Sequence, residues 1–195
     1  TALNAARVMQ PAATPLSERG VAQALAVGRR LAQRGGIGAI VSSDLPRAWR
    51  TAEAIAEALV LPIESSALLQ ERNFGDLRGR PYDTLGFDPL VMESAPPGGE
   101  SAADFALRLQ AAFDQMLQRH AGLDGDLVVV THGLVTRTLL GGPLQLDAGQ
   151  LRDLHLANTS LCIFDATPPH VLRLLNCTRH LDEAVRDDGR SLSGG

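Results

Sequence analysis

Three residues that lie far apart in the sequence carry side chains that could work together on one anionic group. Arg47 lies just inside the expected start of a helix that follows a strand, Glu71 lies at the mouth of a long loop, and His132 follows another strand. An arginine and an imidazole beside helix N-termini can hold an oxyanion, and a nearby carboxyl group can give a proton to a leaving oxygen. Each residue alone is better explained as structural or solvated, but the combination suits phosphoryl transfer.

The stretch around His132 organises the rest of the chain. Residues 126–133 read DLVVVTHG, where three consecutive valines predict a short buried strand and the helical pattern from Leu134 predicts a helix. His132 and Gly133 then occupy the turn at the carboxyl edge of a parallel sheet, where ligands bind. Free N–H groups at the start of the helix favour an anion such as phosphate.

The elements that position these residues alternate between strands and helices. Ser17 is expected to cap a helix that runs to about Arg34, Pro46 lies in the first turn of the next helix, and Ser101 with Asp104 resembles a capping box. Short strands are expected at residues 39–42, 63–65, 126–130, 160–164 and 171–175. This alternation predicts an α/β fold, a three-layer α/β/α sandwich with a mostly parallel central sheet, in a single domain over residues 1–195.

Three segments are expected to lie outside this framework. Residues 1–16 look like a surface loop, and the chain from Ser191 onward looks like a frayed tail. Residues 68–99, which we call the lid, are rich in glycine, proline and apolar side chains. A loop of this length in a compact domain is typical of a lid over a binding site.

The helix at residues 17–34 lacks the strand that a right-handed crossover requires ahead of it. We therefore expect the natural polypeptide to begin upstream of Thr1, with a strand that fills the centre of the sheet.

Composition excludes several classes of protein. All 18 basic residues are arginines, whereas a P-loop NTPase, a Schiff-base enzyme and a protein kinase each need a lysine. A net charge of −4 argues against nucleic acid or an anionic membrane as partner, and no apolar run is long enough to span a bilayer. The histidines show no metal-ligand spacing, so we expect no metal and no cofactor. Cys162 and Cys177 are expected to be free, buried thiols in a reducing cytoplasm.

Several motifs, in the right order, resemble those of the histidine phosphatase superfamily, also called phosphoglycerate mutase-like. The matching segments cover nearly the whole chain and are residues 14–24 (TPLSERGVAQA), 43–52 (SDLPRAWRTA), 69–79 (LQERNFGDLRG), 97–101 (PGGES) and 130–133 (VTHG).

The resemblance implies a phosphoglycerate mutase-like fold and a covalent mechanism without a metal. A histidine in an Arg-His-Gly motif takes the phosphoryl group, Arg47 and His132 clamp its oxygens, and Glu71 is the proton donor to the leaving alcohol. Asn4 and Gly133 are further candidate phosphate contacts. By the resemblance, the Arg-His-Gly segment belongs immediately before Thr1, which agrees with the strand expected there. Residues 1–195 by themselves therefore lack the nucleophile, and we expect them not to turn over substrate.

The expected function is hydrolysis of a small phosphomonoester by a monomer or homodimer. A cofactor-dependent phosphoglycerate mutase is the first alternative, but mutases bind a substrate carboxylate with a basic cluster in the lid. This lid offers only Arg72, Arg78 and Arg80 among many apolar side chains. A natural, non-catalytic phosphate-binding relative is the second alternative.

A serine hydrolase is a different class that the sequence disfavours. Residues 99–103 (GESAA) loosely match a nucleophile elbow around Ser101. They follow a Pro-Pro-Gly-Gly loop, so the strand required before the elbow is absent. We expect Ser101 to cap a helix instead.

Overall fold

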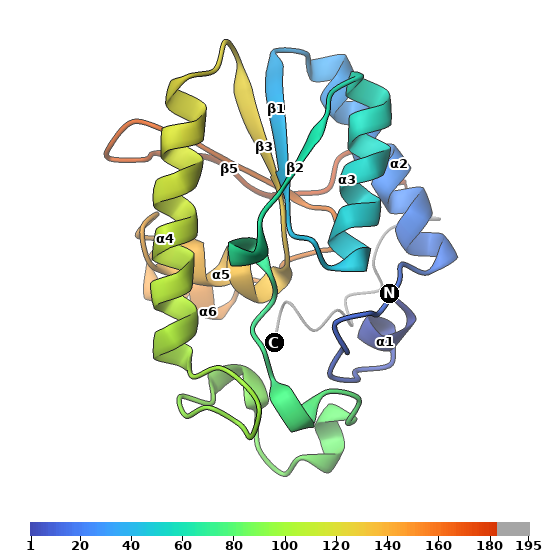
Figure 1. Ribbon diagram of the computed structural model, residues 1–195, viewed down its shortest axis with the longest axis vertical. Coiled ribbons are helices and arrows are strands. Elements are labelled where there is room, and N and C mark those ends of the chain that lie inside the picture. Colours follow the sequence, from blue (N-terminus) through green and yellow to red (C-terminus); the bar gives the residue numbers. More distant parts are fainter. Residues whose placement is uncertain (183–195) are drawn as a thin grey trace.

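The structure is a computed structural model and describes residues 1–182. Helices (α), strands (β) and 3-10 turns (η) alternate along the chain (Figure 1). In chain order they are α1 (Ala2–Ala5), α2 (Glu18–Arg34), β1 (Ile37–Ser42), α3 (Pro46–Leu59), β2 (Ile63–Ser65), η1 (Ala67–Leu69), η2 (Gly75–Leu77), η3 (Tyr82–Thr84), η4 (Pro89–Val91), α4 (Ala102–Ala121), β3 (Asp126–Val130), α5 (Gly133–Gly141), α6 (Ala148–Arg152), β4 (Leu161–Phe164) and β5 (Leu172–Cys177).

Three parallel strands form the central sheet in the order β2-β1-β3. Ile40 of β1 lies opposite Ile63 of β2 and Val128 of β3, so the carboxyl ends of the three strands share one edge. β4 and β5 pair antiparallel in a second, two-stranded sheet. The predicted α/β fold with a mostly parallel central sheet is confirmed.

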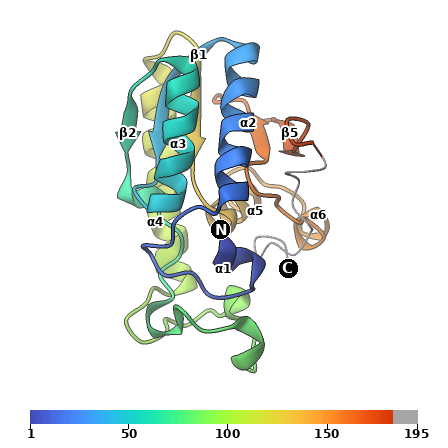
Figure 2. The ribbon, with the colours of Figure 1, turned by 90° about the vertical axis from the view of Figure 1, so that its right-hand side faces the viewer.

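Helices cover both faces of the central sheet (Figures 1 and 2). Ile40 packs with Val27 of α2 and Ala52 of α3 on one face. Val41, the next residue of β1, packs with Phe113 of α4 on the other face. Because successive side chains of a strand point to opposite faces, β1 contributes to two apolar cores, which gives the predicted three layers.

The predicted helix caps are confirmed. Ser17 Oγ accepts a hydrogen bond from the N–H of Gly20, and α2 ends at Gly35, whose φ of 68° is favourable for glycine. Ser101 Oγ accepts from the N–H of Asp104 at the start of α4. Ser101 is therefore a helix cap, as expected, and its position after a turn disfavours a nucleophile elbow.

The prediction that residues 1–16 form a surface loop is wrong. They contain α1, and Met9 is buried with only 3% of its surface exposed. The N–H of Met9 donates to the carbonyl of Arg80 at 2.9 Å, and the N–H of Gly79 donates to the carbonyl of Met9 at 2.7 Å. This pairing with a segment some seventy residues away has no local signal in the sequence.

Burial differs from the expectation at β3 and at the two cysteines. β3 is half-buried except for Val130, because a cavity runs along one side of the strand. Cys162 and Cys177 are free thiols, as expected, but each is half-buried, Cys162 because it borders the same cavity. The tail expected from Ser191 lies outside the described residues.

Candidate active site

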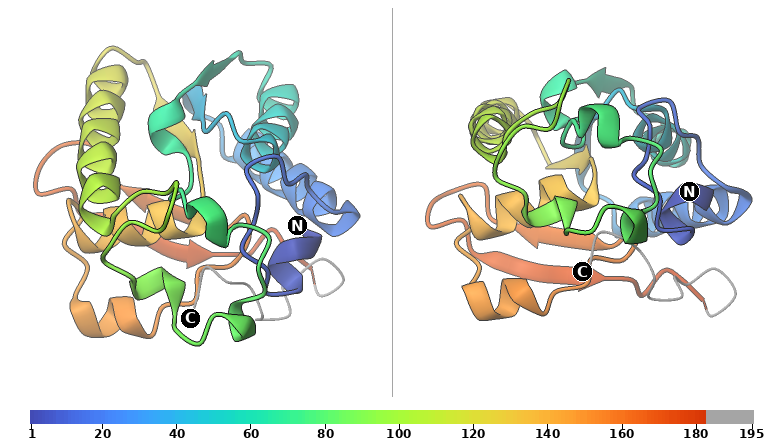
Figure 3. Two further views of the ribbon diagram at one scale, coloured as in Figure 1. Left: turned by 60° about the horizontal axis from the view of Figure 1, so that its bottom comes forward. Right: turned by 90° about the horizontal axis from the view of Figure 1, so that it is seen from below.

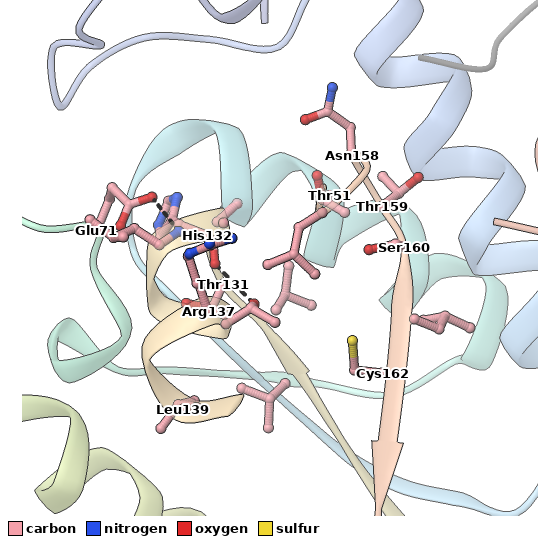
Figure 4. A pocket seen from close by; sticks show the side chains of 18 of the residues that line it. Thr51, Glu71, Thr131, His132, Arg137, Leu139, Asn158, Thr159, Ser160 and Cys162 are labelled. Atoms are coloured by element: carbon pink, nitrogen blue, oxygen red, sulfur yellow. Dashed lines mark hydrogen bonds between the residues drawn. The ribbon is translucent and has the colours of Figure 1, made fainter. Parts of the chain in front are cut away.

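A cavity of about 530 Å³ lies between β3 and β4, with walls from α2 and α5 (Figure 4). The lid lies beyond the carboxyl edge of the sheet (Figures 1 and 3), and Tyr82 and Leu90 of the lid line the cavity. The structure brings every site residue singled out from the sequence to the lining of this one cavity: Asn4, Arg47, Glu71, His132 and Gly133.

Two neighbouring strand ends bring Arg47 and His132 to the cavity. Ser42 at the end of β1 lies opposite Val130 at the end of β3. After β1 the chain turns into α3, where Pro46 and Arg47 are the first two residues. After β3 it turns into α5, for which His132 is the N-cap residue. Adjacent parallel strands thus place two helix N-termini side by side.

His132 is held by a serine from the neighbouring turn. His132 is 8% exposed, and its Nε2 lies 2.8 Å from Ser43 Oγ. Burial, reinforced by the nearby cations Arg47 and Arg108, holds the pKa of His132 well below its usual range. His132 is therefore neutral near pH 7, with one nitrogen that donates and one that accepts a hydrogen bond.

Arg47 is a buried cation at the start of α3. It is 9% exposed, and its guanidinium donates to the carbonyl of Ala12 at 3.4 Å. Burial lowers the pKa of Arg47, and Glu71 opposes that effect, but arginine keeps its charge in proteins. Arg47 and Glu71 form no direct ion pair within residues 1–182. The guanidinium therefore retains donors for an anion.

Glu71 lies at the N-terminus of α5, beside His132 (Figure 4). Its Oε1 accepts from the N–H of Arg72 at 3.0 Å, and its Oε2 accepts from the N–H of Leu134, in the first turn of α5, at 3.3 Å. Burial raises the pKa of the Glu71 carboxyl and outweighs these donors and the cation Arg47, which lower it. A raised pKa favours the protonated form, which is able to donate a proton.

Asn4 and Gly133 complete the predicted set. Asn4 is 7% exposed in α1, and its Nδ2 donates to Oδ1 of Asn158, which also lines the cavity, at 3.2 Å. Gly133 is the first residue of α5. Its N–H belongs to the group at a helix start that has no partner within the helix, so it is placed to meet an anion.

The lid lines the cavity with both apolar and charged side chains. Met9, Phe74 and Leu77 form a buried cluster against which Tyr82 and Leu90 pack. Phe74 and Leu90 also line the cavity, together with the charged side chain of Arg78. A ligand that reaches from Arg47 toward the lid meets the apolar side chains of Phe74, Leu90 and Val91 beside the charged side chains of Arg78 and Asp88.

Sequence reasoning missed the partners that hold the three central residues. Ser43 and Glu100 lie inside the segments 43–52 and 97–101, so they could have been singled out. Asn158 and Arg108 have no local signal, since their contacts join elements far apart in the chain.

Within residues 1–182, no group of three or more histidine, cysteine, aspartate or glutamate side chains is arranged to hold a metal ion. In the same part of the chain, none of the helices has the length and apolar character to cross a bilayer.

Comparison with known proteins places this fold and site in a class. The Bacillus stearothermophilus protein YhfR superimposes with a TM-score of 0.77 at 28% identity, over 92% of this chain and 94% of that one. A mycobacterial glucosyl-3-phosphoglycerate phosphatase, solved in complex with VO3, superimposes with a TM-score of 0.73 at 27% identity, over 91% and 95%. The class is that of phosphoglycerate mutase-like α/β proteins.

The sequence comparisons narrow this class to a family. The model of the histidine phosphatase superfamily, branch 1, matches residues 1–178. A probable phosphoglycerate mutase GpmB of Yersinia pestis is 34% identical over 204 aligned residues, which cover 96% of this chain and 94% of that protein. This chain belongs to branch 1 of the histidine phosphatase superfamily, whose members include phosphatases and mutases, and the predicted family is confirmed.

Proposed function

We propose that this chain is the catalytic domain of a phosphomonoesterase that hydrolyses a small phosphorylated metabolite through a phosphohistidine intermediate. One observation carries the proposal. A buried arginine, a neutral buried histidine and a carboxyl group with a raised pKa, namely Arg47, His132 and Glu71, line the same cavity.

The phosphoryl group binds where β1 and β3 end. Arg47 donates to its oxygens as a cation, and the N–H of Gly133 adds a donor from the start of α5. Because Nε2 of His132 contacts Ser43, Nδ1 is the ring nitrogen that can contact a phosphoryl oxygen. When the Ser43 hydroxyl donates to Nε2, Nδ1 carries the proton and donates as well. Asn4 completes the clamp.

The reaction has two steps. In the first, an imidazole nitrogen attacks phosphorus, the bond to the ester oxygen breaks, and that oxygen takes the proton of Glu71. In the second, the Glu71 carboxylate takes a proton from water as the water oxygen attacks phosphorus, and the P–N bond breaks to release inorganic phosphate. The resemblance assigns the attacking imidazole to a histidine of an Arg-His-Gly motif, which Arg47 and His132 would flank.

The lid favours a phosphatase over a mutase. Arg72 is 2% exposed and donates to the carbonyls of Glu100 and Ser94, so it supports the lid itself. Arg80 is exposed and does not line the cavity, which leaves Arg78 as the lid arginine placed to meet a leaving group. Arg78 lies in a lining that also holds the acidic Asp88 and several apolar side chains, which suits an ester with a partly apolar leaving group better than one with a second acidic group.

The remaining features fit an enzyme for small molecules. The proposal treats residues 1–195 as one domain, a monomer or homodimer of the cytoplasm that needs no metal, no cofactor and no nucleic acid or membrane. The net charge of −4 argues against nucleic acid or an anionic membrane, and the cluster of Arg47, His132 and Glu71 in the cavity lining supports a small phosphomonoester as substrate.

The test uses the protein with its natural N-terminus. Turnover is measured with p-nitrophenyl phosphate and, separately, with 3-phosphoglycerate plus its bisphosphate. We expect hydrolysis of the first and little mutase activity. Efficient mutase turnover would overturn the choice of a phosphatase.

Mass spectrometry after brief exposure to substrate tests the covalent step. We expect a phosphohistidine, and a Glu71→Gln variant should accumulate it once formed from an aryl ester, since the base for water is gone. Persistent absence of both the adduct and turnover would identify a non-catalytic phosphate-binding relative instead.

A further inference from the structure

A half-buried ion pair lies behind the segment that carries Glu71. Arg108 of α4 and Glu100 meet through two parallel contacts, Nε to Oε1 and Nη2 to Oε2, each of 2.8 Å. Their side chains are 20% and 15% exposed. This two-point geometry fixes the orientation of both groups more firmly than a single contact does.

Arg108 holds the backbone on one side of Glu71. Its Nη1 donates to the carbonyl of Leu68 at 2.7 Å and to the carbonyl of Gln70 at 3.0 Å. Arginine supplies this fork of donors in one plane, whereas a lysine would supply a single flexible ammonium.

Glu100 holds the backbone on the other side of Glu71. Its Oε2 accepts from the N–H of Asn73 at 3.1 Å, and its own N–H donates to the carbonyl of Asn73 at 2.8 Å. Its carbonyl also accepts from Arg72 Nε at 3.2 Å. The chain is therefore fixed immediately before and shortly after Glu71.

We propose that Arg108 and Glu100 are positioning residues that hold the Glu71 carboxyl at the N-terminus of α5, facing the cavity. The inference rests on the proposed function, because Glu71 is the acid of that reaction. Neither residue is among those that the resemblance assigned to the reaction. An acid displaced by about 1 Å loses much of its effect on proton transfer.

The role predicts a loss that depends on the leaving group. Benzyl phosphate releases an alkoxide, which needs a proton as the bond breaks, whereas p-nitrophenyl phosphate releases a stable phenolate. The quantity to measure is kcat/KM, since it covers substrate binding and transfer to the imidazole but not hydrolysis of the phosphohistidine. In Arg108→Lys and Arg108→Gln we expect a decrease of about 10- to 100-fold for benzyl phosphate and less than about threefold for p-nitrophenyl phosphate.

Arg119→Gln is the matched control. Arg119 lies on the same helix and also pairs with a glutamate, Glu64, but its side chain is 38% exposed and far from the lid. We expect unchanged kcat/KM for both esters. Equal losses for the two esters in Arg108→Lys, or no loss, would overturn the inference, since a general structural defect affects both alike.

Amide hydrogen exchange tests the positioning without activity. The N–H groups of Arg72 and Leu134 donate to Glu71, whereas the N–H of Thr136, also in α5, donates to the carbonyl of His132. In Arg108→Lys, which keeps the charge and the best chance of folding, we expect exchange at Arg72 and Leu134 to rise about tenfold and exchange at Thr136 to stay as in the wild type.

The two measurements separate the two hypotheses. If the wild type hydrolyses neither ester, the proposed function fails while the exchange rates still decide whether Arg108 positions Glu71. If the wild type is active but Arg72 and Leu134 stay protected in Arg108→Lys, the positioning role is wrong and the proposed function stands.

Discussion

The cavity is bounded on one side by the turns from β1 to α3 and from β3 to α5, and on the other by the lid. The turns follow β1 and β3 and place Arg47 at the start of α3 and His132 at the start of α5, and apolar cores support the sheet on both faces. The lid carries Glu71 and the apolar wall, and it is held by polar contacts that span much of the chain. In the proposed function the two regions have different roles. The turns bind the phosphoryl group, whereas the lid protonates the leaving group and determines which leaving groups fit.

The largest effect is expected from the turns. Arg47→Gln removes a buried cation that meets charge on the phosphoryl oxygens, so we expect kcat/KM to fall about 1,000-fold for every ester tested. Arg50→Gln, an exposed arginine of the same helix that pairs with Glu53, is the control and should be close to wild type. A decrease in kcat/KM confined to alkyl esters would contradict the role of Arg47 in binding the phosphoryl group that all esters share.

Glu71→Gln should produce the next largest effect, and one that depends on pH. We expect kcat/KM to fall about 100-fold for an alkyl ester and only slightly for p-nitrophenyl phosphate. Because burial raises the pKa of Glu71 and the first step needs its protonated form, kcat/KM for the alkyl ester should fall as pH rises through that pKa. The variant should lack this decrease. The same decrease in Glu71→Gln would assign the proton to another group.

Gly28→Ala tests the rigidity of the framework. A Cβ at this position would lie 2.7 Å from the carbonyl oxygen of Ala54, where α2 packs on α3. We expect the free energy of unfolding to fall by about 1 to 3 kcal/mol in denaturant titrations. Gln33→Ala, on the exposed side of α2, is the control. Unchanged stability would mean that α2 and α3 can move apart at little cost.

Leu90→Ala should give the smallest effect and addresses the lid. Leu90 lines the cavity, so its loss should raise KM for esters with an apolar leaving group about 5- to 10-fold. Esters with a small polar leaving group should be unaffected. Equal changes for both kinds of ester would contradict selection by the apolar wall.

The framework could be predicted from the sequence because its signals are local. Ser17 and Gly35 mark the ends of α2, Pro46 marks the start of α3, and the run of valines marks β3. Once these elements are placed in a parallel sheet, topology brings Arg47 and His132 to one edge.

The supporting contacts could not be predicted, since they join residues distant in sequence. Ser43 reaches His132 across 89 positions, and Asn4 reaches Asn158 across 154. The backbone of Met9 likewise pairs with Gly79 and Arg80. Residues 1–16, the expected surface loop, therefore support the lid. Such contacts depend on three-dimensional packing, for which a single sequence carries no periodic pattern.

The hydrogen bond from the N–H of Leu134 to Glu71 has a consequence for the order of events. A bound phosphate and an ionised Glu71 would place two like charges beside the first turn of α5, and each makes the other less favourable. In the proposed reaction, arrival of the dianion would therefore raise the pKa of Glu71 further, and departure of phosphate would lower it again. By thermodynamic reciprocity, protonation of Glu71 at lower pH would increase the affinity for the phosphate dianion. Binding of the ester would thus favour the protonated carboxyl that the first step needs.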